Sequence, residues 1–195
     1  MYPNNEKSSD ITLIFNIFNT FVPVSGNRRM DKKQHRDHPH LTGEHRWGDT
    51  AQLIFFVVFM GIWITDSFVF HYSTSPLQRV PDILRIILAL PVLVAGWILA
   101  RRGLRAIFGT PREQPELIQT GVFRIVRHPI YTGAILFYLA AVLYTMSLAS
   151  AAFWLLIIAL YYLISRYEER LLTEAFGDDY LNYKKKTGML FPKLG

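Results

Sequence analysis

Cysteine is absent from this sequence of 195 residues. A disulfide framework, a thiolate nucleophile and a cysteine metal site are therefore excluded, and the redox compartment stays open. Charged residues are also scarce, at 18%, whereas 51% of the residues are hydrophobic and the mean hydropathy is +0.19. Such a composition is typical of a small protein with several membrane spans, and a soluble domain of this length is usually more polar.

The excess of positive charge does not indicate nucleic acid, although the net charge is +6. Eighteen of the 21 Lys and Arg residues fall in three groups of six, in 25–48, 101–128 and 166–195, and these groups separate the apolar runs. Basic segments between spans set membrane topology and attract anionic headgroups. We therefore expect the partners to be the lipid bilayer and its anionic headgroups.

The apolar runs predict an all-α polytopic membrane protein with about five transmembrane helices. Four spans are expected at 51–71, 81–100, 129–147 and 151–165, with a tight external turn at 148–150 between the last two. The run 11–24 is short for a bilayer, which needs about 20 residues, so it either spans or lies in the interface.

The last span is expected to continue beyond the membrane through Arg166 and to end at Gly177, a natural C-cap. A second, amphipathic helix then follows at 178–186, and we expect Tyr180 and Tyr183 to lie with its lysines on the inner leaflet. We interpret the chain as one membrane domain, 1–195. Its two parts are 1–102, with the first spans and a basic loop, and 103–195, with the helical hairpin and the polar segments on either side of it.

A binding site for an anion is predicted where the helix after Arg127 and His128 begins. Pro129 suits a first helical turn, and the amide groups of 130–132 have no partner within the helix. Together with the helix dipole they attract a carboxylate or phosphate, to which Arg127 and His128 add donors.

A carboxylate pair, Glu168 and Glu169, follows the hairpin. Successive helical residues point about 100° apart, so we expect one to face the site and the other to pair with Arg170 or a lysine. A carboxylate beside an anion site suits a zwitterionic ligand. The alternative is that Arg124 and Arg127 only set topology and that the glutamates form a solvated helix face.

Two motifs lie on either side of the apolar hairpin. The first is Gly121-x-Phe123-Arg124-x-x-Arg127-His128-Pro129-x-Tyr131-x-Gly133, and the second is Glu168-Glu169-x-x-Leu172-x-x-x-Phe176-Gly177-x-x-Tyr180-x-x-Tyr183. Together they resemble the isoprenylcysteine carboxyl methyltransferase family. That family belongs with the phospholipid N-methyltransferases to a wider group of membrane methyltransferases. The resemblance covers roughly 103–195. It implies S-adenosylmethionine as the cofactor, bound at the cytoplasmic surface between the Arg-His-Pro segment and the Glu-Glu helix.

Carried over by position, the implied cofactor contacts are Pro115, Glu116, Leu117, Ile118, Phe123, His128, Pro129, Ile130, Tyr131 and Glu168, to which the anion site adds Gly121 and Arg127. The methionine end of this cofactor is itself a zwitterion. It therefore agrees with the ligand that the charges alone suggest.

Two positions depart from the family pattern. Phe123 replaces the usual tyrosine, and Ile164 stands where the family places an arginine that holds the substrate carboxylate. Carboxyl methylation of a prenylated cysteine is therefore disfavoured. Arg166 is the nearest arginine and a candidate catalytic residue, although it lies about 200° further round the helix.

The acceptor is expected to be a lipophilic or amphipathic molecule, and its chemistry stays open. A carboxylate would need no general base, whereas a phospholipid amine, a thiol or a phenol would need one, and Glu169 and His128 are the candidates. We assign Glu169 as catalytic. A membrane scaffold or sensor that keeps the fold is the alternative from another class. Retention of His128-Pro129 and Glu168-Glu169 favours an enzyme.

A histidine cluster and one acidic residue within a span are two further candidate sites. The cluster His35, His38, His40 and His45 stands among five cationic residues, so a solvated loop is favoured and no metal is expected. Asp66, inside a span, marks either a function or a structural ion pair at the external rim. The expected location is the inner membrane of a prokaryotic cell, with the active site on the cytoplasmic face.

Overall fold

The computed structural model describes residues 46–74, 79–109 and 116–193, and these belong to one compact unit, Pro39–Gly195. The predicted first span, 11–24, and the four clustered histidines lie outside the described residues. The elements are α2 (Arg46–Ile64), which continues as the π-helix η1 (Thr65–Phe70), α3 (Asp82–Phe108), the 3₁₀-helix η3 (Gly121–Arg124), α4 (Pro129–Thr145) and α5 (Leu148–Lys186).

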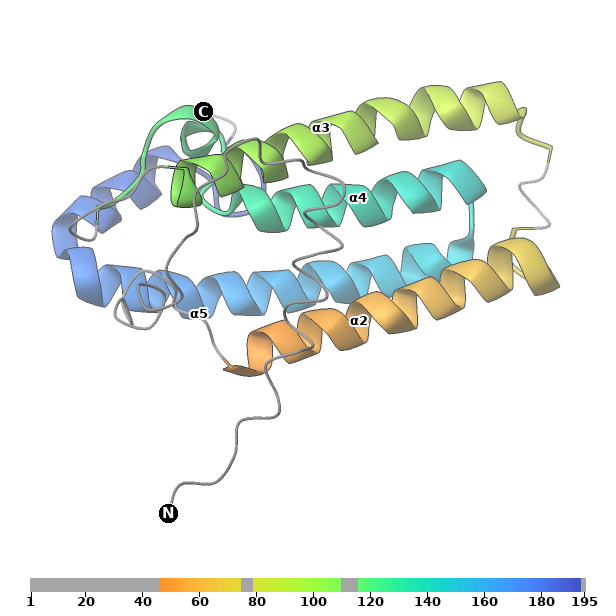
Figure 1. Cartoon of the computed structure of the whole chain (residues 1–195), viewed down its shortest axis with the longest axis horizontal. Helices are drawn as coiled ribbons and strands as arrows, with labels where there is room; N and C mark the ends of the chain where they lie inside the picture. The colour runs from red at the N-terminus through yellow and green to blue at the C-terminus, as the bar shows by residue number, and fades with distance from the viewer. Residues whose placement is uncertain (1–45, 75–78, 110–115, 194–195) are drawn as a thin grey trace, which may run out of the picture. The chain divides into compact units, whose positions relative to one another are not determined.

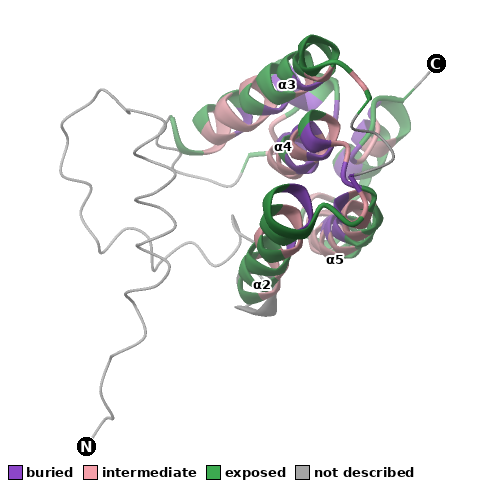
Figure 2. Cartoon of the chain, turned by 90° about the vertical axis from the view of Figure 1, so that its right-hand side faces the viewer, coloured by how far each residue is buried: buried purple, intermediate pink, exposed green. Residues whose placement is uncertain are grey.

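The prediction of an all-α polytopic membrane protein is confirmed. Three of the helical stretches, Thr50–Phe70, Asp82–Phe108 and Leu148–Lys186, are long and apolar enough to cross a membrane, and α4 is a shorter apolar helix. The spanning part of α5 ends near Ser165, because charged side chains begin at Arg166. Many large apolar residues of α2 and α3 are exposed, as lipid contact requires. Figure 2 shows the exposed stretches of both helices in green.

The four long elements lie side by side, with α3 next to α4 and α5 next to α2 (Figure 1). The core lies between α2, α4 and α5 and contains Phe59, Ile135, Tyr138, Ile157 and Tyr161. Three basic segments lie at the same end of the helices (Figure 1). They are the end of α3, the residues before α4 and the last half of α5.

Helices α3 and α4 approach each other most closely at glycines. A Cβ atom added to Gly133 would lie 2.7 Å from the Gly96 carbonyl oxygen and 2.9 Å from the Cβ of Ala100. Farther along, Gly103 faces Pro129 and Ile130 in the same way. Small residues at such a crossing let two membrane helices gain van der Waals contact along their backbones. This packing holds the first turn of α4 against α3.

One sequence expectation about a helix end is wrong. The predicted turn at 148–150 is the first turn of α5, because the Ser147 side chain caps the helix by accepting a hydrogen bond from the Ser150 amide at 3.1 Å. The reversal is made by Met146, with φ of 55°. Helix α3 continues past its arginines to Phe108, so those side chains end the span but not the helix.

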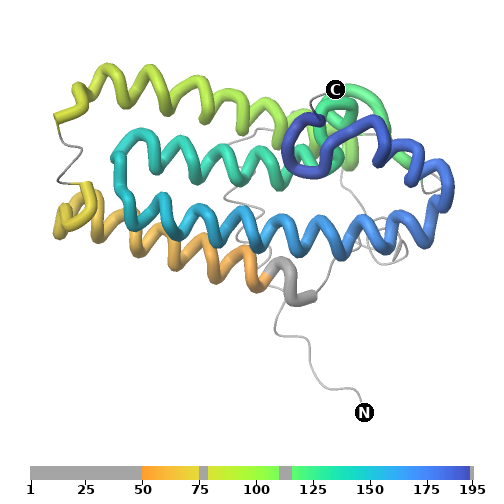
Figure 3. The backbone as a smooth tube through the Cα atoms, turned by 180° about the vertical axis from the view of Figure 1, so that it is seen from behind, coloured from red at the N-terminus to blue at the C-terminus, as the bar shows by residue number. Residues whose placement is uncertain are grey.

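The predicted break at Gly177 is confirmed, since its φ of 53° and ψ of −127° are not helical. The chain there turns back toward η3 (Figure 3). Tyr180 and Tyr183 are buried against Val122 and Phe123, and the Tyr183 hydroxyl donates to the Phe123 carbonyl at 2.5 Å. The expectation that these tyrosines lie on the leaflet is therefore wrong, because the kink directs them into the protein.

Asp66 is buried at the end of the helices opposite to the basic groups. Its Oδ2 accepts hydrogen bonds from the Ser147 hydroxyl at 2.5 Å and from the Ser73 hydroxyl, and its Oδ1 accepts one from the Ser73 amide at 2.9 Å. Hydrogen-bond donors from two loops therefore hold its carboxylate. Asp82 instead faces Arg85 at 3.8 Å. Asp66 thus ties the loop after η1 to the α4–α5 turn.

Candidate functional site

The start of α4 is covered by the residues that follow α5. We call 187–191 the C-terminal segment. The amides of Arg127 and His128 donate to the carbonyls of Gly188 and Met189 at 2.9 and 3.2 Å, and Val126 and Gly188 form an isolated parallel bridge. The Thr132 hydroxyl donates to the Leu190 carbonyl at 2.8 Å. The residues that precede α4 are thereby fixed from the far end of the chain.

A polar cluster stands at this point, and we call His128, Tyr131 and Glu168 the open cluster. Glu168 accepts a hydrogen bond from the Tyr131 hydroxyl at 2.5 Å through Oε1, and its Oε2 lies 3.3 Å from His128 Nδ1. The imidazole and the Tyr131 ring stack at 5.7 Å with an interplanar angle of 7°, and the Tyr161 ring follows at 5.2 Å. Glu168 keeps 21% of its side chain exposed, so this cluster is accessible.

A second, buried group holds the other glutamate. Arg127 contacts Glu169 Oε1 with Nε at 2.7 Å and Nη2 at 2.6 Å, and Lys184 Nζ lies 3.0 Å from Oε2. Arg127 Nη1 also donates to the carbonyls of Lys184, at 3.3 Å, and Thr187. Both oxygens of Glu169 are thus occupied by cations.

His128 lies between the two groups. Its Nε2 is 3.7 Å from Glu169 Oε1, while its Nδ1 faces Glu168. Both glutamates lie near His128, because an imidazole has two nitrogens that can meet two carboxylates about 100° apart. The pairing of the other glutamate with a lysine is confirmed, and the lysine is Lys184.

One nitrogen of this histidine is left without a partner in the described structure. His128 Nε2 is buried and makes no hydrogen bond, since the 3.7 Å separation from Glu169 is too long for one. Buried polar atoms are nearly always satisfied, and an exception in a polar cluster points to a ligand or a moving proton. Nε2 is therefore the atom at which chemistry is expected.

The environment shifts the ionisation of both groups. Burial alone would lower the pKa of His128, but its contacts with Glu168 and Glu169 raise the pKa above its ordinary value. Burial likewise opposes ionisation of Glu169, yet its contacts with His128, Lys184 and Arg127 lower its pKa to about 2. Glu169 is therefore an anion at neutral pH, and the two carboxylates favour the charged form of His128.

The remaining predicted residues lie around these groups. Leu117, Ile118 and Phe123 pack in a second apolar cluster with Tyr180 and Tyr183. Pro129 and Ile130 face Gly103 of α3. The amide of Thr132 is not open to an anion as predicted, because it donates to the His128 carbonyl at 3.0 Å.

Four further positions complete the comparison with the predicted site. Gly121 begins η3 with φ of 62°, a conformation that glycine adopts without strain. Glu116 is exposed, and so is Arg166, whose guanidinium stands 5.9 Å from the centroid of the Tyr162 ring. Pro115 lies outside the described residues. The structure thus brings together Arg127, His128, Tyr131 and the two glutamates, whereas Arg166 lies over the Tyr162 ring.

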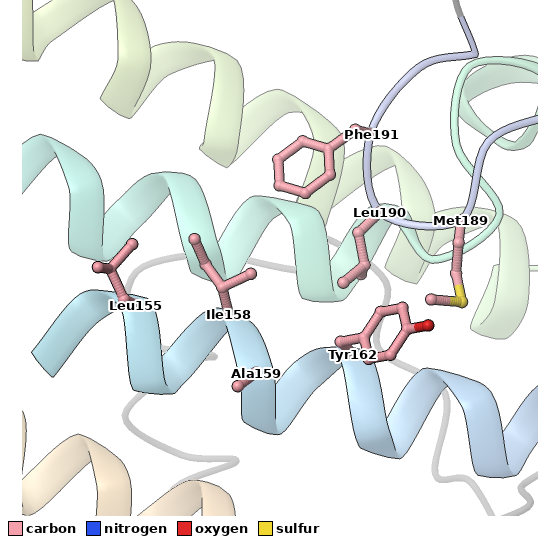
Figure 4. Close-up of a pocket in the computed structure, with 7 residues that line it drawn as sticks. All are labelled: Leu155, Ile158, Ala159, Tyr162, Met189, Leu190 and Phe191. Carbon is pink, nitrogen blue, oxygen red and sulfur yellow. The ribbon is translucent and has the colours of Figure 1, made fainter.

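Two grooves lie beside the site. The apolar groove, of about 370 Å³, runs along α5 below the C-terminal segment (Figure 4) and is lined by Leu155, Ile158, Ala159, Tyr162, Met189, Leu190 and Phe191. A polar groove of about 620 Å³ is lined by Arg166, Tyr167, Glu169, Arg170, Thr173, Glu174 and Lys184. Met189 connects the apolar groove to the open cluster, because its carbonyl accepts the His128 amide hydrogen.

Sequence reasoning missed Lys184 and the C-terminal segment as parts of the site. Lys184 stands in a run of three lysines that reads as a contact with headgroups. The sequence pattern does not distinguish Lys184 from its neighbours, because the chain reversal at Gly177 decides which lysine faces Glu169. Tyr161 is missed for a similar reason, since it lies within an apolar run. Among the described residues, no group of three or more histidine, aspartate or glutamate side chains is placed to hold a metal ion.

Comparison with known proteins gives two results. The family model of phospholipid methyltransferases matches residues 84–179, which include α4 and both glutamates. The chain is also similar to methanethiol S-methyltransferase of Pseudomonas deceptionensis, with 39% identity over 74 residues, which is 37% of this chain and 27% of the relative. Methanethiol S-methyltransferase 1 of Bradyrhizobium diazoefficiens is 36% identical over 87 residues, 44% of this chain and 30% of the relative. The chain thus matches less than a third of the length of either relative.

Proposed function

We propose that this chain, which matches the family model of phospholipid methyltransferases over residues 84–179, transfers a methyl group from S-adenosylmethionine to the sulfur of a lipophilic thiol. The observation that carries the proposal is the buried, unpartnered Nε2 of His128 beside the accessible Glu168. The proposed location is the cytoplasmic face of a prokaryotic inner membrane, which the grouping of basic residues at one end of the helices supports.

The residues present fit two parts of this cofactor. Glu168 is a partly exposed carboxylate that suits an ammonium group, and Tyr131 and His128 form a stacked aromatic wall that suits a flat ring. Arg127, in contrast, is committed to Glu169, so it does not serve as the donor for the cofactor's carboxylate. When bound, S-adenosylmethionine would supply the methyl group from its sulfonium, and its sulfur would leave as a neutral thioether.

The residues of the chain then have to remove a proton from the acceptor. A thiol at neutral pH is mostly protonated, because its ordinary pKa is about 8.5. His128 Nε2 takes this proton while Glu168 holds Nδ1, and the imidazolium that forms lies between two carboxylates. Glu169, which the sequence had suggested as the base, instead stabilises the charge, since it is already saturated by Arg127 and Lys184.

Three features favour a thiol that carries an apolar group. A carboxylate acceptor would need no base, and the position at which the family holds such a carboxylate is Ile164. Both similar relatives carry the name of a thiol methyltransferase. The apolar groove begins at Met189, next to His128, and offers its length to an alkyl chain (Figure 4).

A second candidate acceptor is the amine of a phospholipid headgroup. It is supported by the match to the phospholipid methyltransferase family and by two carboxylates that would attract an amine. A non-catalytic scaffold is less well supported, since a protein without chemistry has no use for an accessible carboxylate and an unpartnered histidine nitrogen in one cluster.

The test uses purified protein in lipid nanodiscs with S-adenosylmethionine labelled in the methyl group. The acceptors are a long-chain alkanethiol, phosphatidylethanolamine and a prenylated cysteine, and the products are separated by mass. We expect the thioether as the main product from wild-type protein and a loss of at least tenfold in His128→Asn. Label in the amine alone would overturn the thiol assignment, and no transfer to any acceptor would overturn the proposed activity.

A further inference from the structure

Lys184 differs from the two lysines that follow it. Its Nζ lies 3.0 Å from Glu169 Oε2 and 5.9 Å from the centroid of the Tyr180 ring, and only 36% of its side chain is exposed. Lys185 and Lys186 are exposed, and Lys185 Nζ donates to the side chain of Asn182 at 3.2 Å. Three chemically identical neighbours thus have different surroundings.

The backbone of the same residue strengthens this difference. The Lys184 carbonyl accepts from Arg127 Nη1 at 3.3 Å, and the Thr187 carbonyl accepts from the same nitrogen. Lys184 therefore touches both members of the Arg127–Glu169 ion pair, one through its main chain and the other through its ammonium group. The reversal at Gly177 makes this contact possible, because it returns the last helical segment to the start of α4.

The charges around His128 balance only if Lys184 is counted. Arg127 and Lys184 carry two positive charges, and Glu168 and Glu169 carry two negative ones. Among the described residues, the other elements packed here contribute uncharged groups. The C-terminal segment presents the Met189 carbonyl, α3 presents Gly103 to Pro129 and Ile130, and the nearby titratable hydroxyls are those of Tyr131, Tyr180 and Tyr183.

We propose that Lys184 is a positioning residue that holds Glu169 on Arg127 and offsets its charge, so that His128 releases its proton more readily. Without the ammonium group, one negative charge beside the imidazole is left uncompensated and retains the proton. The effect on the histidine follows from the charge geometry alone. The kinetic consequence rests on the proposed function, since the rate of methyl transfer depends on the protonation of His128 only if His128 is the catalytic base.

The first test measures the histidine directly. Imidazole nitrogen NMR of the full chain in nanodiscs, with His128 assigned by comparison with His128→Asn, gives its titration midpoint. Lys184 offsets the charge of Glu169, whose Oε1 lies 3.7 Å from His128 Nε2, so we expect Lys184→Met to raise the midpoint by about one pH unit. Lys184→Gln, which keeps a hydrogen-bond donor without the charge, should raise it equally, and Lys184→Arg should restore it.

Lys186→Met is the matched control, because it removes the same charge from an exposed position two residues away. An unchanged midpoint in both Lys184→Met and Lys184→Gln, or an equal shift in Lys186→Met, would overturn the inference. The Gln and Arg variants keep the test decisive if the Met variant fails to fold, which a thermal melt reveals.

The second test follows methyl transfer against pH. In Lys184→Gln the acidic limb of the kcat/KM profile should move to higher pH by about one unit, so that activity lost at pH 7 returns at pH 9. A uniform fall at all pH values would show a merely structural lysine and contradict the inference. If no variant, including wild type, transfers methyl groups while the NMR midpoint still shifts, the proposed function fails and the role of Lys184 stands.

Discussion

Arg127 and Glu169 are 42 residues apart and form a buried ion pair in which two guanidinium nitrogens lie 2.7 and 2.6 Å from the same carboxylate oxygen. Both side chains are less than a tenth exposed. The pair joins the entrance to α4 with α5 and is itself bound by the residues that follow α5. The two halves of the candidate site are thus fixed to each other by one contact, beside the nitrogen that we assign as the base.

The first prediction concerns this pair. Removal of one partner leaves a buried charge uncompensated, which costs about 3–5 kcal/mol. Arg127→Met should therefore lower the free energy of unfolding by about that amount, and Arg127→Lys should recover little, because lysine cannot present two nitrogens to one oxygen. Thermal melts in detergent check this. A double variant, Arg127→Met with Glu169→Leu, should be more stable than Arg127→Met alone; additive losses would contradict a coupled pair.

The second prediction separates the two glutamates. Glu168→Gln should leave the melting temperature within about 2 °C of wild type and weaken cofactor binding at least tenfold, since Glu168 is partly exposed and faces the open cluster. Glu169→Gln should lower the melting temperature clearly, because two cations lose their anion. Melting curves and calorimetric titration of the same preparations provide both values. The reverse pattern would show that Glu169 is the ligand-binding carboxylate.

The third prediction concerns pH. The folded-state pKa of His128 is raised above its unfolded value of about 6.5, so its contribution to stability is complete below that pH and is lost as pH rises through the folded pKa. The folded pKa of Glu169 is about 2, below its ordinary 4.5, so its contribution is present above about pH 4.5 and is lost as pH falls toward 2. Stability should therefore be greatest between about pH 5 and 6.5.

His128→Asn isolates the upper limb of this dependence. The difference in melting temperature between wild type and His128→Asn should shrink as pH rises from 6 to 9, because the contribution of the protonated imidazole disappears. A difference that stays constant over this range would mean that the two glutamates do not favour the charged imidazole.

The fourth prediction tests the packing that holds the first turn of α4. An alanine Cβ at Gly133 would lie 2.7 Å from the Gly96 carbonyl oxygen, so α3 and α4 would have to move apart, at a cost of about 1–3 kcal/mol. Gly61→Ala is the matched control in α2, where nothing lies within 4 Å of the added atom. It should be neutral or stabilising by about 0.5–1 kcal/mol, from helix propensity. Equal melting temperatures of the two variants would contradict the close crossing.

The sequence predicts the helices well because apolar runs, Pro129 and Gly177 are local signals. It also identifies His128 and the two glutamates, since these polar residues flank long spans. What it cannot show is the direction of the chain after Gly177, which depends on contacts between distant residues. The roles of Lys184 and of the C-terminal segment follow from that direction, as does the burial of Tyr180 and Tyr183. Glu169 looks like an exposed base for the same reason, because its two cations come from elsewhere in the chain.

The central claim is that the open cluster binds S-adenosylmethionine, and calorimetric titration of the purified protein in nanodiscs with S-adenosylmethionine tests it most directly. We predict saturable binding to wild type and to Lys186→Met with the same affinity, and at least tenfold weaker binding to Glu168→Gln at an unchanged melting temperature. Absence of saturable heat with wild type at millimolar ligand, or equal affinity of wild type and Glu168→Gln, would contradict the account.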